Sequence, residues 1–232
     1  MTKILFVCHG NICRSPGAEF ILRDLLRRCG LEEGYELASA ATSSEELGNP
    51  VYPPMRRVLA SHGLDCSGKS ARKIRRADYE AFDLILGMDE ENLWSMRRVF
   101  GGDPAGKLQS LMDYAGFPGQ EIADPWYTRD FERAYLELSL ACEGLLYRLT
   151  GIVTVDFSLC PDIPSLYAEL RYKLQWEDWY GENLDALYDI LTGLPHRGER
   201  FLLTMPGPDA PKEAQLYSER IRRCFADAGV LV

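Results

Sequence analysis

The sequence predicts an α/β fold in which a doubly wound parallel sheet is followed by a smaller α/β unit. Two observations indicate this class. Short apolar segments alternate with amphipathic segments of helical length up to about residue 150, which is typical of parallel strands joined by crossover helices. A new cycle of strand and helix signals then begins at Gly151. We therefore expect two domains, residues 1–150 and 151–232, joined by a very short connection.

Apolar periodicity and helix-ending residues define the elements of the first part. The first helix stops before Gly30, and the second stops at His62-Gly63. The third strand is a short continuous apolar run, which is typical of a strand buried on both faces. In chain order we expect strand 4–7, helix 17–29, strand 35–41, helix 54–61, strand 83–87, helix 90–99, strand 108–112 and helix 130–149.

The second part repeats these signals on a smaller scale. An alternating segment predicts a strand, two amphipathic segments predict helices, and a further strand and helix complete the unit. Its own apolar residues are numerous enough to form a separate small core. In chain order we expect strand 152–157, helix 163–174, helix 184–191, strand 201–204 and helix 211–228.

Composition excludes several classes of protein. No apolar run approaches the roughly 18 residues needed to cross a bilayer, and no secretory signal is visible, so we expect a cytoplasmic protein without a membrane partner. The net charge of −9 argues against nucleic-acid binding. Seven cysteines without disulfide-like spacing and only three histidines indicate thiols in a reducing compartment, with no metal site and no cofactor.

Cysteine followed six positions later by arginine is a weak motif, and here it occurs at Cys8/Arg14, Cys66/Arg72 and Cys142/Arg148. Cys142 falls inside the predicted long helix, where backbone N–H groups are already bonded, and Cys66 follows a helix end. Only Cys8 ends an apolar strand shortly before a helix begins. Only there can several backbone N–H groups and a helix N-terminus converge on one anion.

The residues of this loop suit attack on a phosphate ester. Cys8 is the predicted nucleophile, because the N–H groups, the helix terminus and Arg14 favour its thiolate. The planar fork of Arg14 matches two phosphate oxygens. Gly10 permits close approach of the backbone, and Asn11 tolerates a left-handed conformation. The Ser15 hydroxyl can donate to the thiolate, while Pro16 fits the first helical turn.

A leaving phenolate must be protonated, and Asp124 is the candidate general acid. Trp126 and Tyr127 follow it closely and could form the walls of a cleft for an aromatic substrate. His9 is expected to line the cleft rather than act as a base, since adjacent strand residues point apart. Cys13 is either a structural thiol or the partner of Cys8 in a reversible disulfide.

The segment Val7-Cys8-His9-Gly10-Asn11-Ile12-Cys13-Arg14-Ser15-Pro16, with Asp124-Pro125-Trp126-Tyr127 downstream, resembles the low-molecular-weight protein tyrosine phosphatases. The resemblance implies a flavodoxin-like fold, a cysteinyl-phosphate intermediate, and Asp124 acting first as acid and then as base. It also implies that the substrate, a phosphotyrosine-containing protein or a small aryl phosphate, contacts His9, Gly10, Asn11, Ile12, Cys13, Ser15, Trp126 and Tyr127.

Two positions refine this resemblance. Ile12 stands where relatives acting on phosphoarginine carry threonine, which favours a phosphotyrosine-type substrate. Glu45 stands near the place where many members carry a tryptophan; an acid there removes an aromatic wall and repels acidic substrates. Related arsenate reductases share the loop, so an arsenate reductase-like activity is an alternative, although no further redox cysteines are evident in the spacing.

The second part contains an acidic and aromatic segment at residues 176–189. Asp185 and Asp189 are four positions apart and therefore share one face of a helix. One interpretation is a solvated helix with core aromatics. The other is an interface that covers a basic pocket with acids and aromatic anchors.

The run Trp179-Tyr180-Gly181-Glu182-Asn183-Leu184-Asp185-Ala186-Leu187-Tyr188-Asp189 resembles barstar, an intracellular ribonuclease inhibitor. The resemblance implies a small α/β domain with a short parallel sheet. It also implies that a ribonuclease is bound through Trp179, Asn183, Asp185, Tyr188 and Asp189, with Asp189 as the central acid. Three alternatives remain: ribonuclease inhibition with an accessory phosphatase domain, internal inhibition of the phosphatase by the second domain, and a purely structural second domain.

Overall fold

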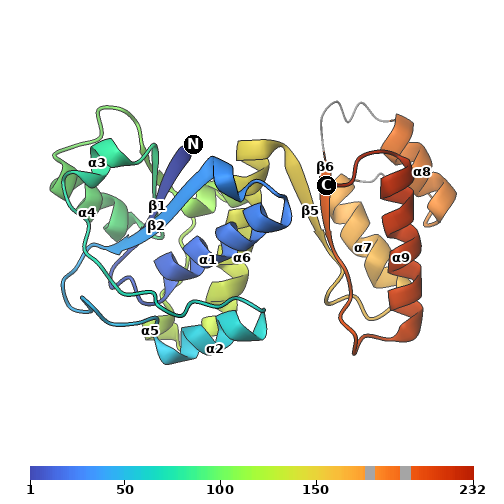
Figure 1. The fold of residues 1–232 in the computed structure, drawn as a ribbon, viewed down its shortest axis with the longest axis horizontal. Helices are drawn as coiled ribbons and strands as arrows, with labels where there is room; N and C mark the ends of the chain where they lie inside the picture. The colour runs from blue at the N-terminus through green and yellow to red at the C-terminus, as the bar shows by residue number, and fades with distance from the viewer. Residues whose placement is uncertain (176–180, 194–199) are drawn as a thin grey trace. The chain divides into compact units, whose positions relative to one another are not determined.

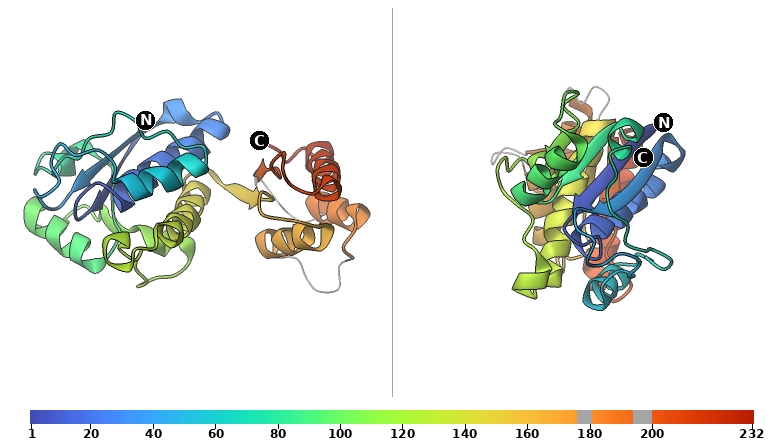
Figure 2. Two further views of the ribbon diagram at one scale, coloured as in Figure 1. Left: turned by 90° about the horizontal axis from the view of Figure 1, so that it is seen from below. Right: turned by 90° about the vertical axis from the view of Figure 1, so that its left-hand side faces the viewer.

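The computed structural model describes residues 1–175, 181–193 and 200–232. The chain divides into two compact units, Met1–Arg148 and Leu149–Val232 (Figures 1 and 2). No helix among these described residues is long and apolar enough to span a membrane. Trp179 and Tyr180, two of the aromatic residues singled out in the sequence, lie outside the described residues.

A four-stranded parallel sheet organises the first unit, in the order β2-β1-β3-β4. This confirms the predicted parallel sheet. In parallel strands the carboxyl ends meet at one edge, so the residues that follow β1 and β3 come together there. The strands are β1 (Thr2–Cys8), β2 (Tyr35–Ala41), β3 (Leu84–Gly87) and β4 (Leu108–Ser110).

Helices cover both faces of this sheet (Figure 1). On one face, α1 (Arg14–Arg28) packs on β1 and β2. Helix α6 (Phe131–Thr150) contacts α1, where the Cys142 thiol donates a hydrogen bond to the Ala18 carbonyl. A Cβ on Gly17 would lie 2.9 Å from Leu138 of α6 and from Met55 of α2 (Pro53–Ser61). A larger residue at Gly17 would therefore force the Leu138 and Met55 side chains to shift.

The other face is covered by α3 (Asp78–Ala81) and α4 (Glu90–Phe100). Leu5 and Val7 of β1 point into this layer and join one buried cluster with Leu93 and Met96 of α4. Successive strand residues point to opposite faces, so Ile4 and Phe6, also fully buried, serve the α1 face. Burial on both faces explains why this strand is a continuous apolar run.

The structure corrects several predicted boundaries. Helix α1 begins at Arg14 rather than at residue 17, because Ser15 and Pro16 already form its first turn. Strand β4 ends at Ser110, and Leu111–Ala115 form a 3₁₀-helix. The short helices α3 and α5 (Pro125–Thr128) and the 3₁₀-helix Glu32–Gly34 were not predicted, since elements of three or four residues carry no periodic signal.

The second unit contains a two-stranded parallel sheet, as the sequence predicted. Its core joins apolar residues from both strands and all three helices, including Val155, Tyr167, Leu187, Phe201 and Phe225. Asp162 and Ser165 form a reciprocal capping box that fixes the start of the first helix. The elements are β5 (Ile152–Asp156), α7 (Ile163–Leu174), α8 (Leu184–Gly193), β6 (Arg200–Thr204) and α9 (Lys212–Asp227).

Candidate active site

Cys8 is the last residue of β1, and five loop residues separate it from Arg14, the first residue of α1. No side chain caps the N-terminus of α1 by a hydrogen bond, so its first N–H groups face the loop. The other two motif matches lack this setting. Cys142 lies within α6, and Cys66 lies between α2 and α3, as the sequence predicted. The strand–loop–helix arrangement belongs to Cys8 alone.

The Cys8 thiol is buried and is surrounded by hydrogen-bonding groups. Its Sγ lies 3.1 Å from the Ser15 Oγ, and it accepts a 3.3 Å hydrogen bond from the backbone N–H of Asn11. Donors placed around a sulfur stabilise negative charge on it. Cys8 therefore has the surroundings of a nucleophile rather than those of a core residue.

Asn11 braces the loop. Its backbone is left-handed, with φ 57°, a conformation that asparagine tolerates better than most residues. Its Nδ2 donates to Ser15 Oγ at 2.9 Å and to Ser39 Oγ at 2.8 Å, and its Oδ1 accepts from the Arg72 N–H at 3.1 Å. The same side chain thus fixes the residue that contacts the Cys8 sulfur.

A buried carboxylate supports this brace from behind. Glu19 of α1 is only 5% exposed, and its Oε2 accepts hydrogen bonds of 2.6 Å from both Ser39 Oγ and Lys69 Nζ. Its Oε1 accepts from Arg23 at 2.7 Å. A continuous set of polar contacts therefore runs from Lys69 through Glu19, Ser39 and Asn11 to the loop.

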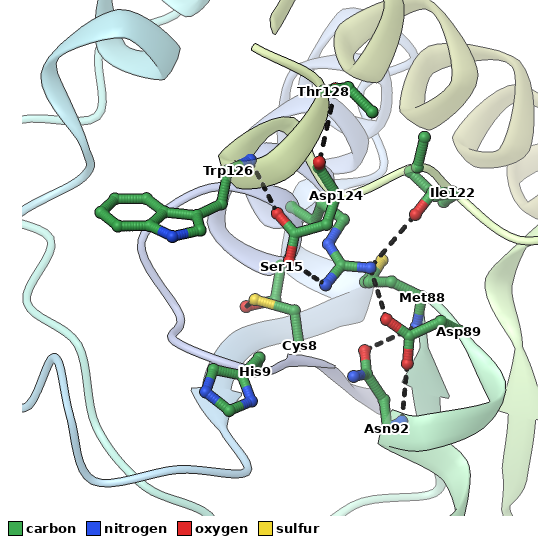
Figure 3. A network of polar contacts seen from close by, with 12 residues as sticks. Cys8, His9, Ser15, Met88, Asp89, Asn92, Ile122, Asp124, Trp126 and Thr128 are labelled. Carbon is green, nitrogen blue, oxygen red and sulfur yellow. Dashed lines mark hydrogen bonds and ion pairs between the residues drawn. The ribbon is translucent and has the colours of Figure 1, made fainter. Parts of the chain in front are cut away.

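Arg14 is 3% exposed and lies between two carboxylates, those of Asp89 and Asp124, which are labelled in Figure 3. Its Nη1 donates to Asp89 Oδ2 at 2.6 Å and to the Ile122 carbonyl at 3.1 Å, and its Nη2 donates to Asp124 Oδ2 at 2.6 Å. Burial opposes the charge, but electrostatic interactions with Cys8, Asp124 and Asp89 outweigh it and raise the pKa of Arg14. The guanidinium is a permanent, oriented cation.

Asp124 lies at the N-terminus of α5. Its Oδ1 accepts from the Trp126 N–H at 3.0 Å, and its carbonyl accepts from the Thr128 hydroxyl (Figure 3). The turn signal of Asp-Pro is therefore real, yet the carboxylate keeps its second oxygen for Arg14. The structure brings Cys8, Arg14 and Asp124 to one edge of the sheet, as their predicted roles require.

Sequence reasoning missed Asp89. This residue follows β3 and is the N-cap of α4, where its Oδ1 accepts from the Asn92 N–H at 2.7 Å while Oδ2 holds Arg14. A usable signal existed, because an acid directly after a buried strand lies at the carboxyl edge of the sheet. It was obscured because a capping carboxylate at a helix start is common.

The aromatic side chains beside the site differ from the prediction, because Tyr52 rather than Tyr127 packs against Trp126. Trp126, 42% exposed, lies edge-on to Tyr52 with ring centroids 5.4 Å apart, and Tyr52 packs on Phe131 at 5.7 Å. The Tyr52 N–H donates to the Ile12 carbonyl of the loop at 2.8 Å. Tyr52 was not predicted, whereas the predicted Tyr127 is 83% exposed. No local signal marks Tyr52, which reaches the site through tertiary packing.

The rim of the loop is acidic. His9 Nε2 lies 3.2 Å from Glu45 Oε2, so the glutamate expected in place of an aromatic wall contacts the residue next to Cys8. A Cβ on Gly10 would lie 3.3 Å from Glu46 Cγ, so a second acid also lies close to the loop. The substrate contacts predicted for His9 and Gly10 remain predictions.

Cys13 and Ile12 are buried within the loop. Burial, and next the negative Cys8 and Asp124, raise the pKa of the Cys13 thiol far above its ordinary value. Cys8 and Cys13 are both free thiols in this structure. Cys13 is therefore a neutral thiol beside the proposed nucleophile, and a reversible disulfide between the two remains a prediction.

Helix α8 carries most of the second predicted face. Asn183 caps it by accepting from the Ala186 N–H at 2.9 Å. Asp185, Tyr188 and Asp189 are all exposed, while the opposite side buries Leu187, Ile190 and Leu191 in the core. The predicted common face of Asp185 and Asp189 is confirmed. Trp179, the fifth predicted contact, lies outside the described residues.

A parallel sheet that presents a thiol, a buried arginine and a carboxyl group at its carboxyl edge defines the class of cysteine-dependent phosphatases. Residues 3–153 match the family model of the low molecular weight phosphotyrosine protein phosphatases, and the chain belongs to that family. Residues 150–230 match the model of Barstar (barnase inhibitor). The fusion expected from the sequence, and with it the enzyme class, is confirmed.

Individual relatives agree with this assignment. The chain is 37% identical over 147 residues to the low molecular weight protein-tyrosine-phosphatase YfkJ of Bacillus subtilis, which covers 63% of this chain and 94% of that protein. It is 37% identical over 148 residues to the human low molecular weight phosphotyrosine protein phosphatase, covering 62% and 93%. The crystal structure of YfkJ covers 65% of this chain and 96% of that chain, with 36% identity and a TM-score of 0.63.

Proposed function

We propose that the first unit hydrolyses phosphomonoesters, foremost protein phosphotyrosine or small aryl phosphates, through a cysteinyl-phosphate intermediate. The observation that supports this most directly is the convergence of three groups. The Cys8 sulfur sits among donors, the Arg14 guanidinium is buried, and the Asp124 carboxylate lies 2.6 Å from that guanidinium. We assign Cys8 as the nucleophile, Arg14 as the group that binds the phosphate, and Asp124 as the general acid.

In the first step the Cys8 thiolate attacks phosphorus. The Sγ–P bond forms as the bond from phosphorus to the aryl oxygen breaks, and protonated Asp124 gives its proton to the departing oxygen. The Arg14 fork and the loop N–H groups hold the equatorial oxygens, whose charge they stabilise in the transition state. Phosphate oxygens replace Asp124 on Arg14 Nη2, which releases the carboxyl group toward the leaving group.

In the second step water attacks the cysteinyl phosphate. The O–P bond forms, the Sγ–P bond breaks, and Asp124, now a carboxylate, accepts the proton of the water. Ser15 and the Asn11 N–H stabilise the thiolate that departs. Inorganic phosphate leaves, and Asp124 is again protonated for the next cycle.

Hydrolysis of p-nitrophenyl phosphate tests this function. We expect turnover by the full-length protein, loss of turnover in Cys8→Ser, and a rapid burst of p-nitrophenolate ahead of steady-state phosphate release, which reports the cysteinyl-phosphate intermediate. A protein that folds normally but does not hydrolyse this ester would contradict the proposal. Arsenate reduction, the alternative from sequence, is tested with the same variants by following arsenite formation.

We propose a second function, protein binding by the barstar-like unit, with a barnase-type ribonuclease as the first partner to test. It is supported by the exposed face of α8, which presents Asp185, Tyr188 and Asp189 while the core holds the other side of the helix. Acids with an aromatic anchor suit a basic enzyme cleft.

Calorimetric titration with barnase tests this second function. We expect binding by the full-length protein and at least about 30-fold weaker binding by Asp189→Ala, if Asp189 is a central contact. Glu213→Ala is the matched control, since Glu213 is also an exposed acid on a helix of this unit. No heat of binding with the unaltered chain would contradict the proposal.

A cytoplasmic location, where thiols such as Cys8 stay reduced, remains part of the proposed role.

A further inference from the structure

A hollow of about 470 Å³ lies between α2 and the start of α6. We name it the α2–α6 pocket. Its lining includes Arg57, Ser61, Arg129, Asp130, Phe131 and Glu132. None of these residues belongs to the reaction steps proposed for Cys8, Arg14 and Asp124.

The pocket begins at the aromatic wall of the active site. Phe131, which lines it, packs on Tyr52, and Tyr52 packs on Trp126 with centroids 5.4 Å apart. The Arg129 guanidinium lies over the Trp126 ring, 5.2 Å from its centroid. Trp126 donates its N–H to Asp124. A chain of contacts therefore leads from Asp124 at the Cys8 loop through Trp126 to the pocket, along which an extended peptide, at about 3.5 Å per residue, could lie.

The pocket is lined by two arginines and two acids, Asp130 and Glu132, but these acids do not pair with the arginines. Asp130 is used in capping α6, where its Oδ1 accepts from the Arg133 N–H at 2.9 Å, and Glu132 lies 3.5 Å from His62 Nε2. Within residues 1–175, 181–193 and 200–232, no carboxylate oxygen lies within 4.0 Å of the Arg57 or Arg129 guanidinium. Two cations with unused donors line one hollow.

The backbone of Arg129 is left-handed, with φ 59°, at the C-terminus of α5. Glycine or asparagine takes this conformation with less strain, and an arginine here places its guanidinium over Trp126 at the pocket. Glu45 lies beside His9 at the rim of the Cys8 loop, where its carboxylate repels acids.

We propose that the α2–α6 pocket binds an acidic side chain near the phosphotyrosine of a protein substrate. This inference rests on the proposed phosphatase function and specifies its substrates. The Arg57 and Arg129 guanidiniums bind the carboxylate, Phe131 and Trp126 cover the intervening chain, and the acidic rim at Glu45 disfavours acids beside it. Small aryl phosphates do not reach the pocket.

The test uses phosphotyrosine peptides that differ only by Glu or Gln, placed in turn at each of three positions on either side. Binding to full-length Cys8→Ser is measured by fluorescence anisotropy, and kcat/KM is measured with the active protein. The pocket variant is Arg57→Gln combined with Arg129→Asn, because asparagine tolerates the left-handed backbone. Arg56→Gln is the control, since Arg56 is an exposed neighbour on α2 that does not line this pocket.

We expect a Glu peptide to bind about 5- to 10-fold more tightly than its Gln partner at positions on one side, as for two partly exposed charge pairs. High salt should reduce the preference. The pocket variant should lose it, Arg56→Gln should keep it, and kcat/KM for p-nitrophenyl phosphate should not change in either variant. Equal binding of every Glu and Gln pair, or equal loss in Arg56→Gln, would overturn the inference. Because binding is measured without turnover, an absence of p-nitrophenyl phosphate hydrolysis would count against the phosphatase function alone.

Discussion

Arg14 Nη2 and Asp124 Oδ2 lie 2.6 Å apart, although the two residues are 110 positions apart in the chain. The same guanidinium holds Asp89 through its other terminal nitrogen, Nη1. One carboxylate therefore positions the arginine from α4, and the other can be exchanged for a phosphate oxygen. Substitution of Asp124 and of Asp89 should therefore have different effects on catalysis.

Asp124→Asn removes the proposed proton donor and keeps the side-chain shape. We expect kcat/KM to fall about 10²- to 10³-fold for esters of basic phenols, within the range of general acid catalysis. The loss should shrink for acidic phenols, which leave without a proton. A plot of log kcat/KM, which reports the step that releases the phenol, against leaving-group pKa checks this, and an unchanged slope would contradict the role of Asp124.

Asp89→Asn removes the negative charge that faces Arg14. It keeps the helix cap, because asparagine caps helices as well as aspartate does. We expect kcat/KM to fall about tenfold, because the arginine is less firmly oriented, with less than about 1 kcal/mol change in stability. Asp162→Asn is the matched control, since Asp162 caps α7 in the other unit. An equal loss of activity in both variants would count against a positioning role for Asp89.

Lys69→Met tests the buried support of the loop. Glu19 keeps Arg23 and Ser39 but loses one of its two cations, so the free energy of unfolding should fall by roughly 2–3 kcal/mol. Activity on p-nitrophenyl phosphate should also fall, because Ser39 holds Asn11. Urea denaturation measures the first effect. Lys73→Met, at an exposed lysine bonded only to Ser44 among the described contacts, should change neither quantity appreciably.

Burial raises the pKa of the Cys142 thiol above its ordinary value of 9.0. The folded form thus keeps the proton longer than the unfolded chain, so this contribution to stability is complete below pH 9 and is lost as pH rises further. Each such group lowers the free energy of unfolding by about 1.4 kcal/mol per pH unit in that range. Urea denaturation from pH 8 to pH 10.5 should show the decline, and Cys142→Ala should make its slope shallower.

The pKa of the Cys13 thiol is also raised, which leads to a prediction about how the two loop cysteines react with an alkylating reagent. Since burial holds the pKa of Cys13 well above its ordinary value, iodoacetamide at pH 7.5 should label Cys8 and leave Cys13 unmodified, because only thiolates react quickly. Peptide mass mapping after brief labelling checks this. Preferential labelling of Cys13 would contradict the assignment of Cys8 as the nucleophile.

Much of the site follows from local sequence. The apolar run before Cys8, the Gly10-Asn11 turn and the start of a helix at Ser15-Pro16 fix a strand–loop–helix unit, because strand, turn and helix preferences depend on near neighbours. That is why the nucleophile and the arginine could be placed and why the parallel sheet was predicted correctly. The same reasoning set aside Cys66 and Cys142, and the structure agrees.

Tertiary structure decided the groups that come from elsewhere in the chain. Asp89 and Ser39 reach the site because parallel strands lie side by side in the sheet, and Tyr52 reaches it because the start of α2 packs against the loop. Periodicity does not reveal which distant residue will meet Arg14, since that depends on strand order and on packing of whole side chains. The sequence by itself determined the strand–loop–helix unit and the barstar-like second part, because both rest on local motifs. Only the folded chain decided which acids hold Arg14, because these come from distant segments that strand order and packing bring together.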